Sequence, residues 1–160
     1  MDGAVVRRAA VAIGSNLGDR AAAILFATDR LTALMPDLVV SDAVETYPDG
    51  EGLEDQPLYL NAVAVGHTSL TARALLDALL AIEQAYGRDR PYPGAPRTLD
   101  LDLILLGDAD EQAPGLHVPH PRFRERFFVL GPMAEVAPDL VDPVSGMRVG
   151  ELLKKLLREK

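Results

Sequence analysis

The sequence contains no cysteine and no tryptophan, and its 160 residues include only four tyrosines and four phenylalanines. Without cysteine the chain has no disulfide framework, no thiolate metal site and no cysteine nucleophile. Its first residues lack the apolar stretch of a signal peptide, and its apolar runs, such as residues 103–107, are far shorter than the roughly 18 residues that a membrane-spanning helix needs. These absences predict a cytoplasmic protein with no membrane partner.

Basic residues are also few, because 16 Lys and Arg stand against 24 Asp and Glu, which gives a formal net charge of −8. Nucleic acids and anionic membranes attract basic surfaces, so this balance argues against either as the main partner. Hydrophobic residues make up 48% of the chain, which is enough for a buried core, and the length is that of one ordinary domain. We therefore predict a single domain over residues 1–160.

The spacing of apolar residues predicts strands interleaved with helices. The predicted strands cover residues 9–13, 38–47, 58–68 and 98–107, and the predicted helices cover residues 19–34, 71–87, 127–136 and 149–157. Between them lie long irregular segments over residues 48–57 and 87–98, an acidic turn over residues 108–114 and an extended segment over residues 117–121. The loop between the second and third strands is too short for a crossover helix. We therefore predict an α+β fold with a mixed or antiparallel sheet.

The strongest feature for function is an Asp-x-Asp pair at the start of the fourth predicted strand. Residues two apart in a strand lie on one face, about 6.6 to 6.8 Å apart, so Asp100 and Asp102 stand side by side. The acidic face continues into Ile104 and Leu106. The opposite face carries the leucines Leu99, Leu101 and Leu103. Two neighbouring carboxylates repel one another, and hard cations such as Mg²⁺ relieve that repulsion, whereas the alternative is a solvated strand end.

Six of the thirteen arginines lie in two short segments on either side of this strand. They are Arg88, Arg90 and Arg97 in the first segment and Arg122, Arg124 and Arg126 in the second. A planar guanidinium matches phosphate oxygens with several donors, and the first segment contains no lysine. Because Arg97 immediately precedes the strand, we predict one site in which a metal-bound polyphosphate meets both kinds of charge. The alternative is solvated loop charges that pair with Asp89 and Glu125.

Two further segments combine a constrained backbone with polar side chains. Residues 14–18 (GSNLG) connect the first strand to the first helix, as a phosphate loop does, but they lack its Gly-Lys-Ser/Thr signature. The pattern favours a tight turn in which Asn16 or Asp19 caps the helix. His120 stands between two prolines, and its ring either donates to a phosphate oxygen or has a structural role.

Polar and aromatic residues of the third strand indicate a site for a heterocycle. Tyr59 and Asn61 share one face of that strand. The Asn61 amide has the donor and acceptor to recognise a heterocycle edge, and Tyr59 or Phe128 has the ring to stack on it. The alternative for Asn61 is a buried amide with internal partners. For Glu83, at the end of the second helix, a salt bridge to an arginine of the first segment is the simpler explanation.

Four segments together resemble one enzyme family. They are residues 12–18 (AIGSNLG), 55–61 (DQPLYLN), 95–102 (APRTLDLD) and 118–122 (VPHPR). In this order they resemble the 6-hydroxymethyl-7,8-dihydropterin pyrophosphokinases, and the string over residues 96–102 is specific to that family. The resemblance implies a ferredoxin-like α/β sandwich. It also implies an ATP-dependent diphosphotransferase, which moves the β,γ-diphosphate of MgATP to the hydroxymethyl group of the pterin and releases AMP in folate synthesis.

The same resemblance implies roles for individual residues. Asp100 and Asp102 would hold two Mg²⁺ ions. The pterin would be bound by Thr46, Tyr59, Asn61 and Phe128, with the two aromatic rings on either side of it. ATP would be surrounded by Glu83, Arg88, Arg90, Arg97, His120 and Arg126, of which Arg88 and Arg97 would touch phosphates. We expect a monomer whose partners are these two small-molecule substrates.

Two departures from the family pattern fall in the predicted loops. Gly94 and Ala95 stand where relatives commonly have Trp-Gly, and that loop is shorter, while the loop over residues 48–57 is longer than in some relatives. Two other classes of protein also fit part of the pattern. One is a non-catalytic module that senses nucleotide or metal, and the other is an RNA-binding sheet, which would require a basic face with exposed aromatics.

Overall fold

The computed structural model describes residues 5–46, 58–88 and 98–159. Within these ranges the elements are β1 (Arg7–Ser15), α1 (Arg20–Leu34), β2 (Val39–Val40), β3 (Val44–Thr46), β4 (Tyr59–Thr68), α2 (Ala72–Arg88), β5 (Asp100–Leu106), β6 (Glu111–Ala113), β7 (Leu116–Val118), the 3-10 helix η1 (Phe123–Glu125), α3 (Phe127–Val136) and α4 (Val149–Arg158). All four predicted helices are therefore present. The loops predicted over residues 48–57 and 87–98 lie largely outside the described residues, and so do the family departures predicted there.

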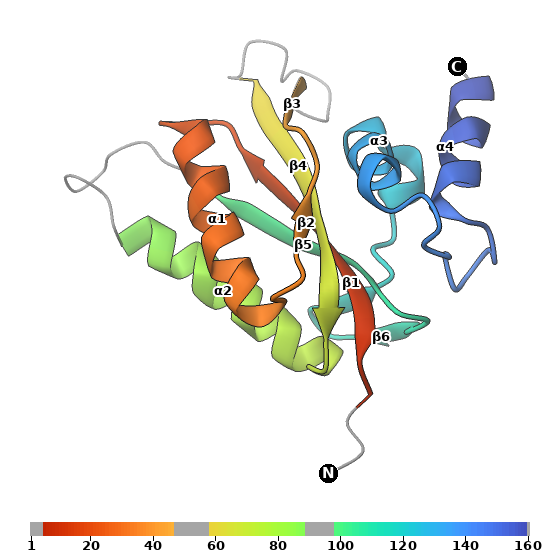
Figure 1. Cartoon of the computed structure of the whole chain (residues 1–160), viewed down its shortest axis with the longest axis horizontal. Helices are drawn as coiled ribbons and strands as arrows, with labels where there is room; N and C mark the ends of the chain where they lie inside the picture. Colours follow the sequence, from red (N-terminus) through yellow and green to blue (C-terminus); the bar gives the residue numbers. More distant parts are fainter. Residues whose placement is uncertain (1–4, 47–57, 89–97, 160) are drawn as a thin grey trace.

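A central antiparallel sheet separates two layers of helices. Its strands lie in the order β2-β4-β1-β5, β3 also pairs with β4, and β6 with β7 forms a separate hairpin. Helices α1 and α2 cover one face of the sheet, and α3 and α4 lie on the other side (Figure 1). Every pairing between the described strands is antiparallel. The α+β class with a mainly antiparallel sheet is confirmed, whereas the parallel pair that a mixed sheet requires is absent from this part of the chain.

Polar side chains cap the N-termini of the first two helices. The Asp19 carboxylate accepts a hydrogen bond from the Ala22 N–H at 3.0 Å, and the Thr71 hydroxyl accepts one from the Ala74 N–H at 3.1 Å. Such caps satisfy N–H groups that the first helical turn leaves without intrahelical partners. Of the two residues predicted to cap α1, Asp19 is the cap and Asn16 has another role.

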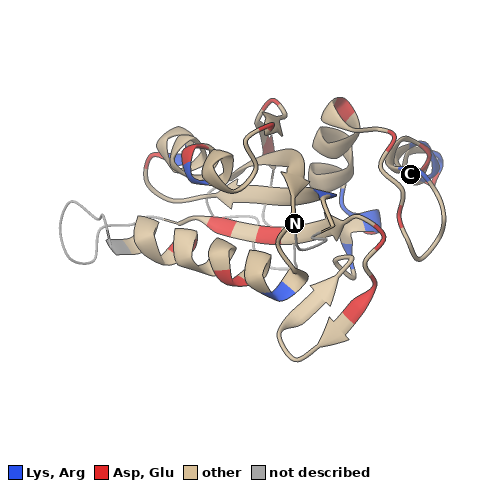
Figure 2. Cartoon of the chain, turned by 60° about the horizontal axis from the view of Figure 1, so that its bottom comes forward, with Lys and Arg blue, Asp and Glu red and all other residues tan. Residues whose placement is uncertain are grey.

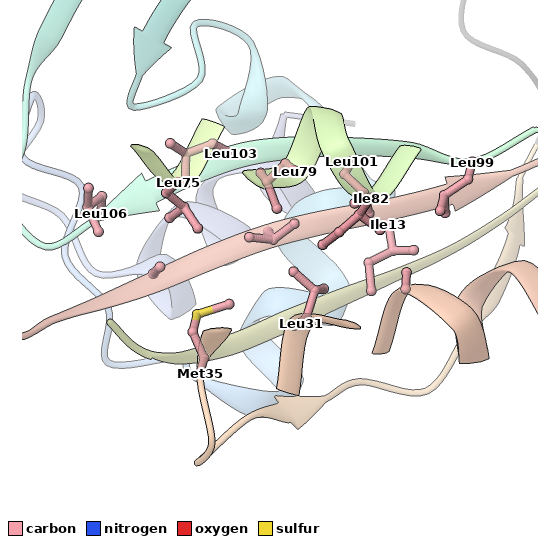
Figure 3. Close-up of a cluster of buried hydrophobic side chains, with 14 of the residues drawn as sticks. Ile13, Leu31, Met35, Leu75, Leu79, Ile82, Leu99, Leu101, Leu103 and Leu106 are labelled. Carbon is pink, nitrogen blue, oxygen red and sulfur yellow. The ribbon is translucent and has the colours of Figure 1, made fainter. Parts of the chain in front are cut away.

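The larger core fills the space between the sheet and helices α1 and α2 (Figure 3). It includes Ile13, Leu31, Met35, Leu75, Leu79, Ile82, Leu99, Leu101 and Leu103. Leu101 and Leu103 thus point toward the helices, as the strand alternation predicts. The acidic pair of β5, which alternates with these leucines, is therefore directed to the opposite face of the sheet.

A second core lies on that opposite face, beside α3. Ile104 and Leu105 of β5 both belong to it. The register of β5 against β1 shifts at this point, so that Ile104 has no partner residue on β1. Such a β-bulge changes the alternation of side chains, and Leu106 consequently joins Leu103 in the larger core. The prediction that Leu106 continues the acidic face is wrong for this reason.

Three other predictions of secondary structure fail at local features. The strand predicted over residues 38–47 is divided into β2 and β3. The Ser41 hydroxyl, in place of a backbone carbonyl, accepts the hydrogen bond of the Val63 N–H there. The acidic turn predicted over residues 108–114 contains β6, which pairs with β7. Gly87, predicted to end the second helix, lies within α2.

Charged side chains are spread over several elements. In the view of Figure 2, acidic residues occur on helices, strands and turns, and the basic residues of the described ranges do not form one continuous face. None of the helices in these ranges is long and apolar enough to cross a membrane. The distribution agrees with the acidic balance of the sequence.

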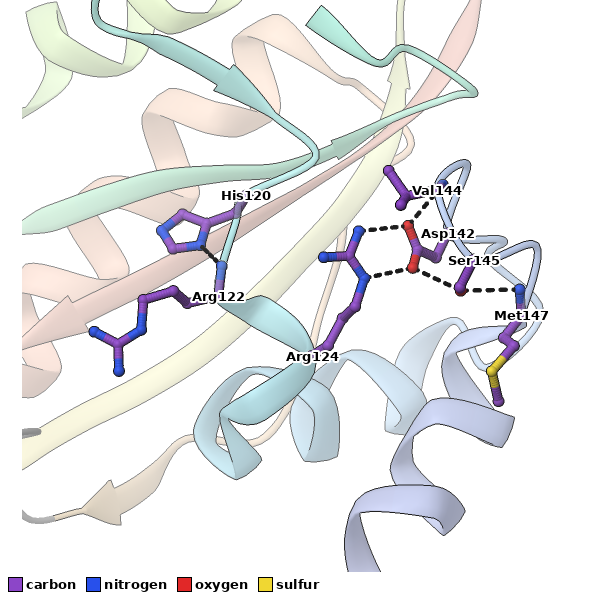
Figure 4. Close-up of polar contacts among 7 residues, drawn as sticks. All are labelled: His120, Arg122, Arg124, Asp142, Val144, Ser145 and Met147. Atoms are coloured by element: carbon purple, nitrogen blue, oxygen red, sulfur yellow. Dashed lines mark hydrogen bonds and ion pairs between the residues drawn. The ribbon is translucent and has the colours of Figure 1, made fainter. Parts of the chain in front are cut away.

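A buried aspartate ties the C-terminal segment to η1. The Asp142 side chain is fully buried, and its two oxygens accept hydrogen bonds from Arg124, at 2.5 Å from Nε and 2.8 Å from Nη2. The Ser145 hydroxyl and the Val144 N–H donate to the same carboxylate (Figure 4). Burial opposes ionisation of Asp142, but these hydrogen bonds outweigh it and lower its pKa to about 2.

We expect this carboxylate to make the fold acid-sensitive. Because the pKa of folded Asp142 lies below its ordinary value of 3.8, the stabilisation is fully present above about pH 4 and is lost as the pH falls through about 2. A shift of this size corresponds to about 2 kcal/mol. Urea unfolding of Asp142→Asn should lack this part of the acid dependence, whereas Asp139→Asn, which removes an exposed ion pair with Arg8, should retain it. Identical pH dependence in wild type and Asp142→Asn would contradict the expectation.

Candidate active site

The register of three strands brings polar residues from distant parts of the sequence onto one face of the sheet. Gly14 on β1 lies between Asn61 on β4 and Asp100 on β5, and in the next row Ala12 lies beside Asp102. A pocket opens at this place between the sheet and α3. Its lining includes Gly14, Asn61, Asp100, Asp102 and Phe128. The predicted metal ligands and part of the predicted pterin site therefore share one cavity.

Thr46 and Asn61 make a direct polar contact beside this pocket. Thr46 pairs with Tyr59 in the ladder between β3 and β4, and its hydroxyl accepts a hydrogen bond from Asn61 Nδ2 at 2.6 Å. Asn61 is only 7% exposed. The sequence left open that Asn61 is a buried amide with internal partners, and this is confirmed for Nδ2, which donates to Thr46. The Oδ1 atom is directed toward Gly14. The four residues predicted to bind the pterin come from two strands, β3 and β4, and from α3. Asn61 and Phe128 line the pocket, and Thr46 contacts Asn61 beside it.

The two aspartates concentrate negative charge at the other end of the pocket. Burial raises the pKa of Asp100, and the charge of Asp102 raises it further, although the Tyr59 hydroxyl hydrogen-bonds to Asp100 and lowers it. Burial and the charge of Asp100 likewise raise the pKa of Tyr59. This burial is partial, because both aspartates keep part of their surface exposed to solvent. The repulsion between the two carboxylates would be relieved by a cationic ligand.

His120 is fixed beside the carboxylates. Its N–H donates to the carbonyl of Ile104, two residues beyond Asp102, at 2.9 Å. Its Nδ1 accepts a hydrogen bond from the Arg122 N–H at 3.1 Å, which places the proton of the neutral ring on Nε2. Burial lowers the pKa of His120; the charge of Asp102 opposes this effect, and those of Arg126 and Arg122 reinforce it. The neutral ring thus offers an Nε2–H donor.

Comparison with known proteins distinguishes the three classes that the sequence leaves open. Residues 10–138 match the model of the family described as 7,8-dihydro-6-hydroxymethylpterin-pyrophosphokinase (HPPK). The chain belongs to the HPPK family. It is 42% identical over 149 residues to the 2-amino-4-hydroxy-6-hydroxymethyldihydropteridine pyrophosphokinase of Pseudomonas aeruginosa, covering 93% of this chain and 91% of the relative. The enzyme of the same name from Methylorubrum extorquens is 40% identical over 149 residues, 93% of each chain.

The activity of this HPPK is that of an ATP-binding pyrophosphokinase of folate biosynthesis. Solved structures of Plasmodium falciparum HPPK-DHPS share its fold. The wild-type structure with pteroate gives a TM-score of 0.69 at 14% identity and the one with SDX-DHP gives 0.72 at 13%, each over 99% of this chain. This chain spans 44% and 46% of those longer chains, so it corresponds to one part of them.

In this HPPK, Glu83 contacts the backbone of the strand that carries the acidic pair. Its Oε2 accepts a hydrogen bond from the Leu101 N–H at 2.6 Å. Burial raises the pKa of Glu83, the Leu101 N–H lowers it, and the charges of Asp100 and Asp102 raise it again. Glu83 therefore holds β5 between the two aspartates, a role that its sequence position does not reveal.

The first arginine segment is only partly described. Arg90 and Arg97 lie outside the described residues, and the side chain of Arg88, at the end of α2, does so too. Their contacts with ATP, and the salt bridge predicted for Glu83, stay predictions.

The second arginine segment divides between two tasks. The guanidinium carbon of Arg126 lies 5.5 Å from the centre of the ring of Phe128, which lines the pocket. Arg124 instead turns to the buried Asp142. A run of alternating arginines in the sequence does not distinguish these two directions.

Thr98 is a residue that the sequence does not single out, and it secures the turn after β1. Its Oγ1 accepts hydrogen bonds from the Asn16 N–H at 2.8 Å and the Leu17 N–H at 3.2 Å, and donates to Asn16 Oδ1 at 3.0 Å. The Ser15 hydroxyl donates to the Thr98 carbonyl at 2.7 Å. A phosphate loop would present such backbone N–H groups to its ligand, but here they are occupied. The turn over residues 14–18 therefore has a structural role, because it joins β1 to the start of β5. This agrees with the predicted tight turn and not with a phosphate loop.

We expect Gly14→Ala to weaken pterin binding by about 1 kcal/mol, roughly fivefold, because a crowded site must shift to accept the methyl group. The new Cβ would stand 3.2 Å from Asn61 Oδ1 and 3.6 Å from the Tyr59 ring. Calorimetry with the pterin tests this expectation. The control is Gly131→Ala in α3, where a Cβ meets no atom within 4 Å. Equal effects of the two substitutions would show that Gly14 is not part of the pterin site.

Proposed function

We propose that the pocket between the sheet and α3 is the pterin site of this enzyme. Thr46 and Asn61 would face the polar edge of the pterin, and Tyr59 and Phe128 would lie against its ring. The proposal is supported by the close contact of Asn61 with Thr46 and by the position of Phe128 on the far wall of the same pocket. An amide that is nearly buried yet borders a cavity is suited to recognise a heterocycle by hydrogen bonds.

We infer that ATP lies along β5 and the segment that follows β7. His120 would donate from Nε2 to a phosphate oxygen, and Arg126 would contribute positive charge. Glu83 and Arg90 complete the predicted ATP contacts, with Arg88 and Arg97 on the phosphates. The proposal is supported by two observations: His120 lies close enough to Asp102 and Arg126 for both charges to shift its pKa, and Arg126 lies against the ring of Phe128, which lines the pocket.

The acidic pair has the donor set that Mg²⁺ prefers. Asp100 and Asp102 supply carboxylate oxygens from one strand face, and their mutual repulsion is a cost that a divalent cation would remove. Within the described residues no group of three or more His, Asp or Glu side chains could hold a metal. Two carboxylates suit Mg²⁺, because this ion commonly keeps water molecules and binds substrate phosphates as well. We propose that Asp100 and Asp102 hold two Mg²⁺ ions, which would neutralise charge on the polyphosphate.

The chain's own residues then contribute mainly alignment. The pterin hydroxyl attacks the β-phosphorus, the bond from this phosphorus to the oxygen of the α-phosphate breaks, and AMP leaves. Phosphoryl transfer of this kind depends on positioning and on stabilisation of charge more than on covalent catalysis. The stacked ring and the Asn61 contact would orient the hydroxyl, while Arg88 and Arg97 would offset charge on the leaving AMP.

Product analysis tests the proposed reaction. With MgATP and 6-hydroxymethyl-7,8-dihydropterin, the enzyme should form AMP and the pterin diphosphate in equal amounts. Formation of ADP would indicate transfer of a single phosphoryl group, and binding without any nucleotide product would indicate a sensor module. Either result would contradict the proposal.

The topology supports the ferredoxin-like description of the fold. The order of elements β1-α1-β2-β4-α2-β5 and the antiparallel strand order β2-β4-β1-β5 correspond to two βαβ halves on one sheet. The single domain over residues 1–160, the monomer and the cytoplasmic location stay predictions.

A further inference from the structure

The short helix η1 lies between two groups of side chains (Figure 4). His120 and Arg122 are on one side of it, whereas Arg124 extends to the other side and meets Asp142. Asp142 lies in the loop between α3 and α4, and the Ser145 hydroxyl of the same loop donates to it at 2.7 Å. The ion pair therefore connects η1 to the loop between α3 and α4.

Two side chains attach η1 to the rest of the protein. Phe123 is fully buried in the second core, and Arg124 binds both oxygens of Asp142. The N-terminal end of η1 has no side-chain cap. A single apolar anchor allows η1 to rotate about it, but a bidentate hydrogen bond has a fixed direction. Phe123 and Arg124 together fix the direction of the backbone that leads from η1 to Arg126. The Arg126 N–H donates to the Phe123 carbonyl at 3.3 Å.

Stability alone is a weak explanation for such a pair. Although the ionised Asp142 is favoured over its protonated form, replacing a buried ion pair by apolar residues of similar volume is often neutral for stability. The bidentate geometry, which allows one relative orientation of the two segments, therefore needs another explanation. The same loop has a second ion pair, between Asp139 and Arg8 of β1, which is exposed and does not reach η1. The Asp139–Arg8 pair can therefore serve as a control, because it lies in the same loop as Asp142 but does not contact η1.

We propose that Arg124 and Asp142 are positioning residues of the pyrophosphokinase reaction. By holding η1 in one orientation they align Arg126 and His120 with ATP, and they do not touch ATP themselves. This inference rests on the proposed ATP contacts of Arg126 and His120. Displacement of a ligand-holding group by about 1 Å can lower a rate by about 100-fold. We expect Asp142→Asn and Arg124→Gln to lower kcat/KM for ATP by about 10- to 100-fold.

The experiment is steady-state AMP formation at a temperature well below the Tm of each variant, with the folded fraction measured by circular dichroism. Asp142→Asn and Arg124→Gln should show the loss mainly in kcat/KM for ATP, with a smaller change in KM for the pterin. Arg124→Lys, which keeps the charge without the bidentate fork, should recover part of the loss. Asp139→Asn should keep wild-type kinetics.

A coupling measurement separates positioning from general destabilisation. In an Arg126→Ala background, Asp142→Asn should cause a much smaller further loss, because the residue through which it acts is already gone. Lower Tm with unchanged kinetics in Asp142→Asn and Arg124→Gln would overturn the inference. If these two variants do not fold, Arg124→Lys and Ser145→Ala carry the same test, and wild-type kinetics in both would overturn it.

The same variants distinguish failure of this inference from failure of the proposed ATP site. If Arg126→Ala and His120→Ala lower kcat/KM for ATP while the variants of the pair do not, the positioning role alone is wrong. If Arg126→Ala and His120→Ala also leave ATP kinetics unchanged, the proposed ATP contacts are wrong and the inference falls with them.

Discussion

Asp100→Asn and Asp102→Asn should each lower turnover by several orders of magnitude while the fold is kept. The amide retains the shape of the carboxylate but loses the charge that a divalent cation requires. The larger core holds β5 from its other face, through Leu101 and Leu103, so neither substitution disturbs packing. Turnover at saturating MgATP and pterin is the measurement, and Asp29→Asn on the exposed side of α1 is the control.

The same substitutions should not reduce stability. The charge of Asp102 raises the pKa of Asp100, which means that folding brings the two carboxylates into repulsion at neutral pH. Removing one charge relieves it, and urea unfolding at pH 7 should show equal or slightly greater stability. Unchanged turnover of both variants, at saturating Mg²⁺, would show that the two aspartates are only a solvated strand end and do not hold a metal ion.

Asn61→Ala should weaken pterin binding by about 1 to 3 kcal/mol, because a buried heterocycle edge loses its hydrogen-bond partner. The affinity for MgATP should change little, since Asn61 lies across β1 from the acidic strand. Thr46→Val is the matched variant. It removes the hydroxyl that accepts from Asn61 Nδ2 and leaves the amide in place, so its effect should be smaller.

Separate calorimetric titrations with the pterin and with MgATP measure both affinities. Circular dichroism of the two variants provides the control for folding. Equal losses of affinity for the two ligands would place Asn61 in the structural core of the enzyme and contradict its assignment to the pterin site.

The strand alternation of β5 was sufficient to predict the acidic face, because Asp100 and Asp102 precede any irregularity. The prediction fails four residues later, at Leu106, where a bulge depends on the pairing with β1 and leaves no mark in the local sequence. The same limit applies to Gly14. Its position between Asn61 and Asp100 follows from the register of three strands, which alternation within one strand does not specify.

The direction in which individual side chains point was the other feature that could not be predicted from the sequence. Thr98 lies beside Arg97 in a motif that resembles the family, yet its contact is with Asn16, 82 residues earlier in the chain. The arginines of the second segment are chemically identical, and only the fold directs Arg124 to Asp142 and Arg126 to the ring of Phe128. Composition thus predicts that arginines are available, and tertiary packing determines which of them reach the ligand.

The contact between Glu83 and Leu101 also affects how the molecule behaves toward its own copies. Among the described strands β5 is the last of the sheet, and an unpaired edge strand is a template for another chain. The Leu101 N–H is already bonded to Glu83, and the Ile104 carbonyl is already bonded to the His120 N–H. A neighbouring molecule that adds a strand at these two positions would have to displace both. The residues that hold β5 for the reaction therefore also protect the enzyme against edge-to-edge aggregation at high concentration.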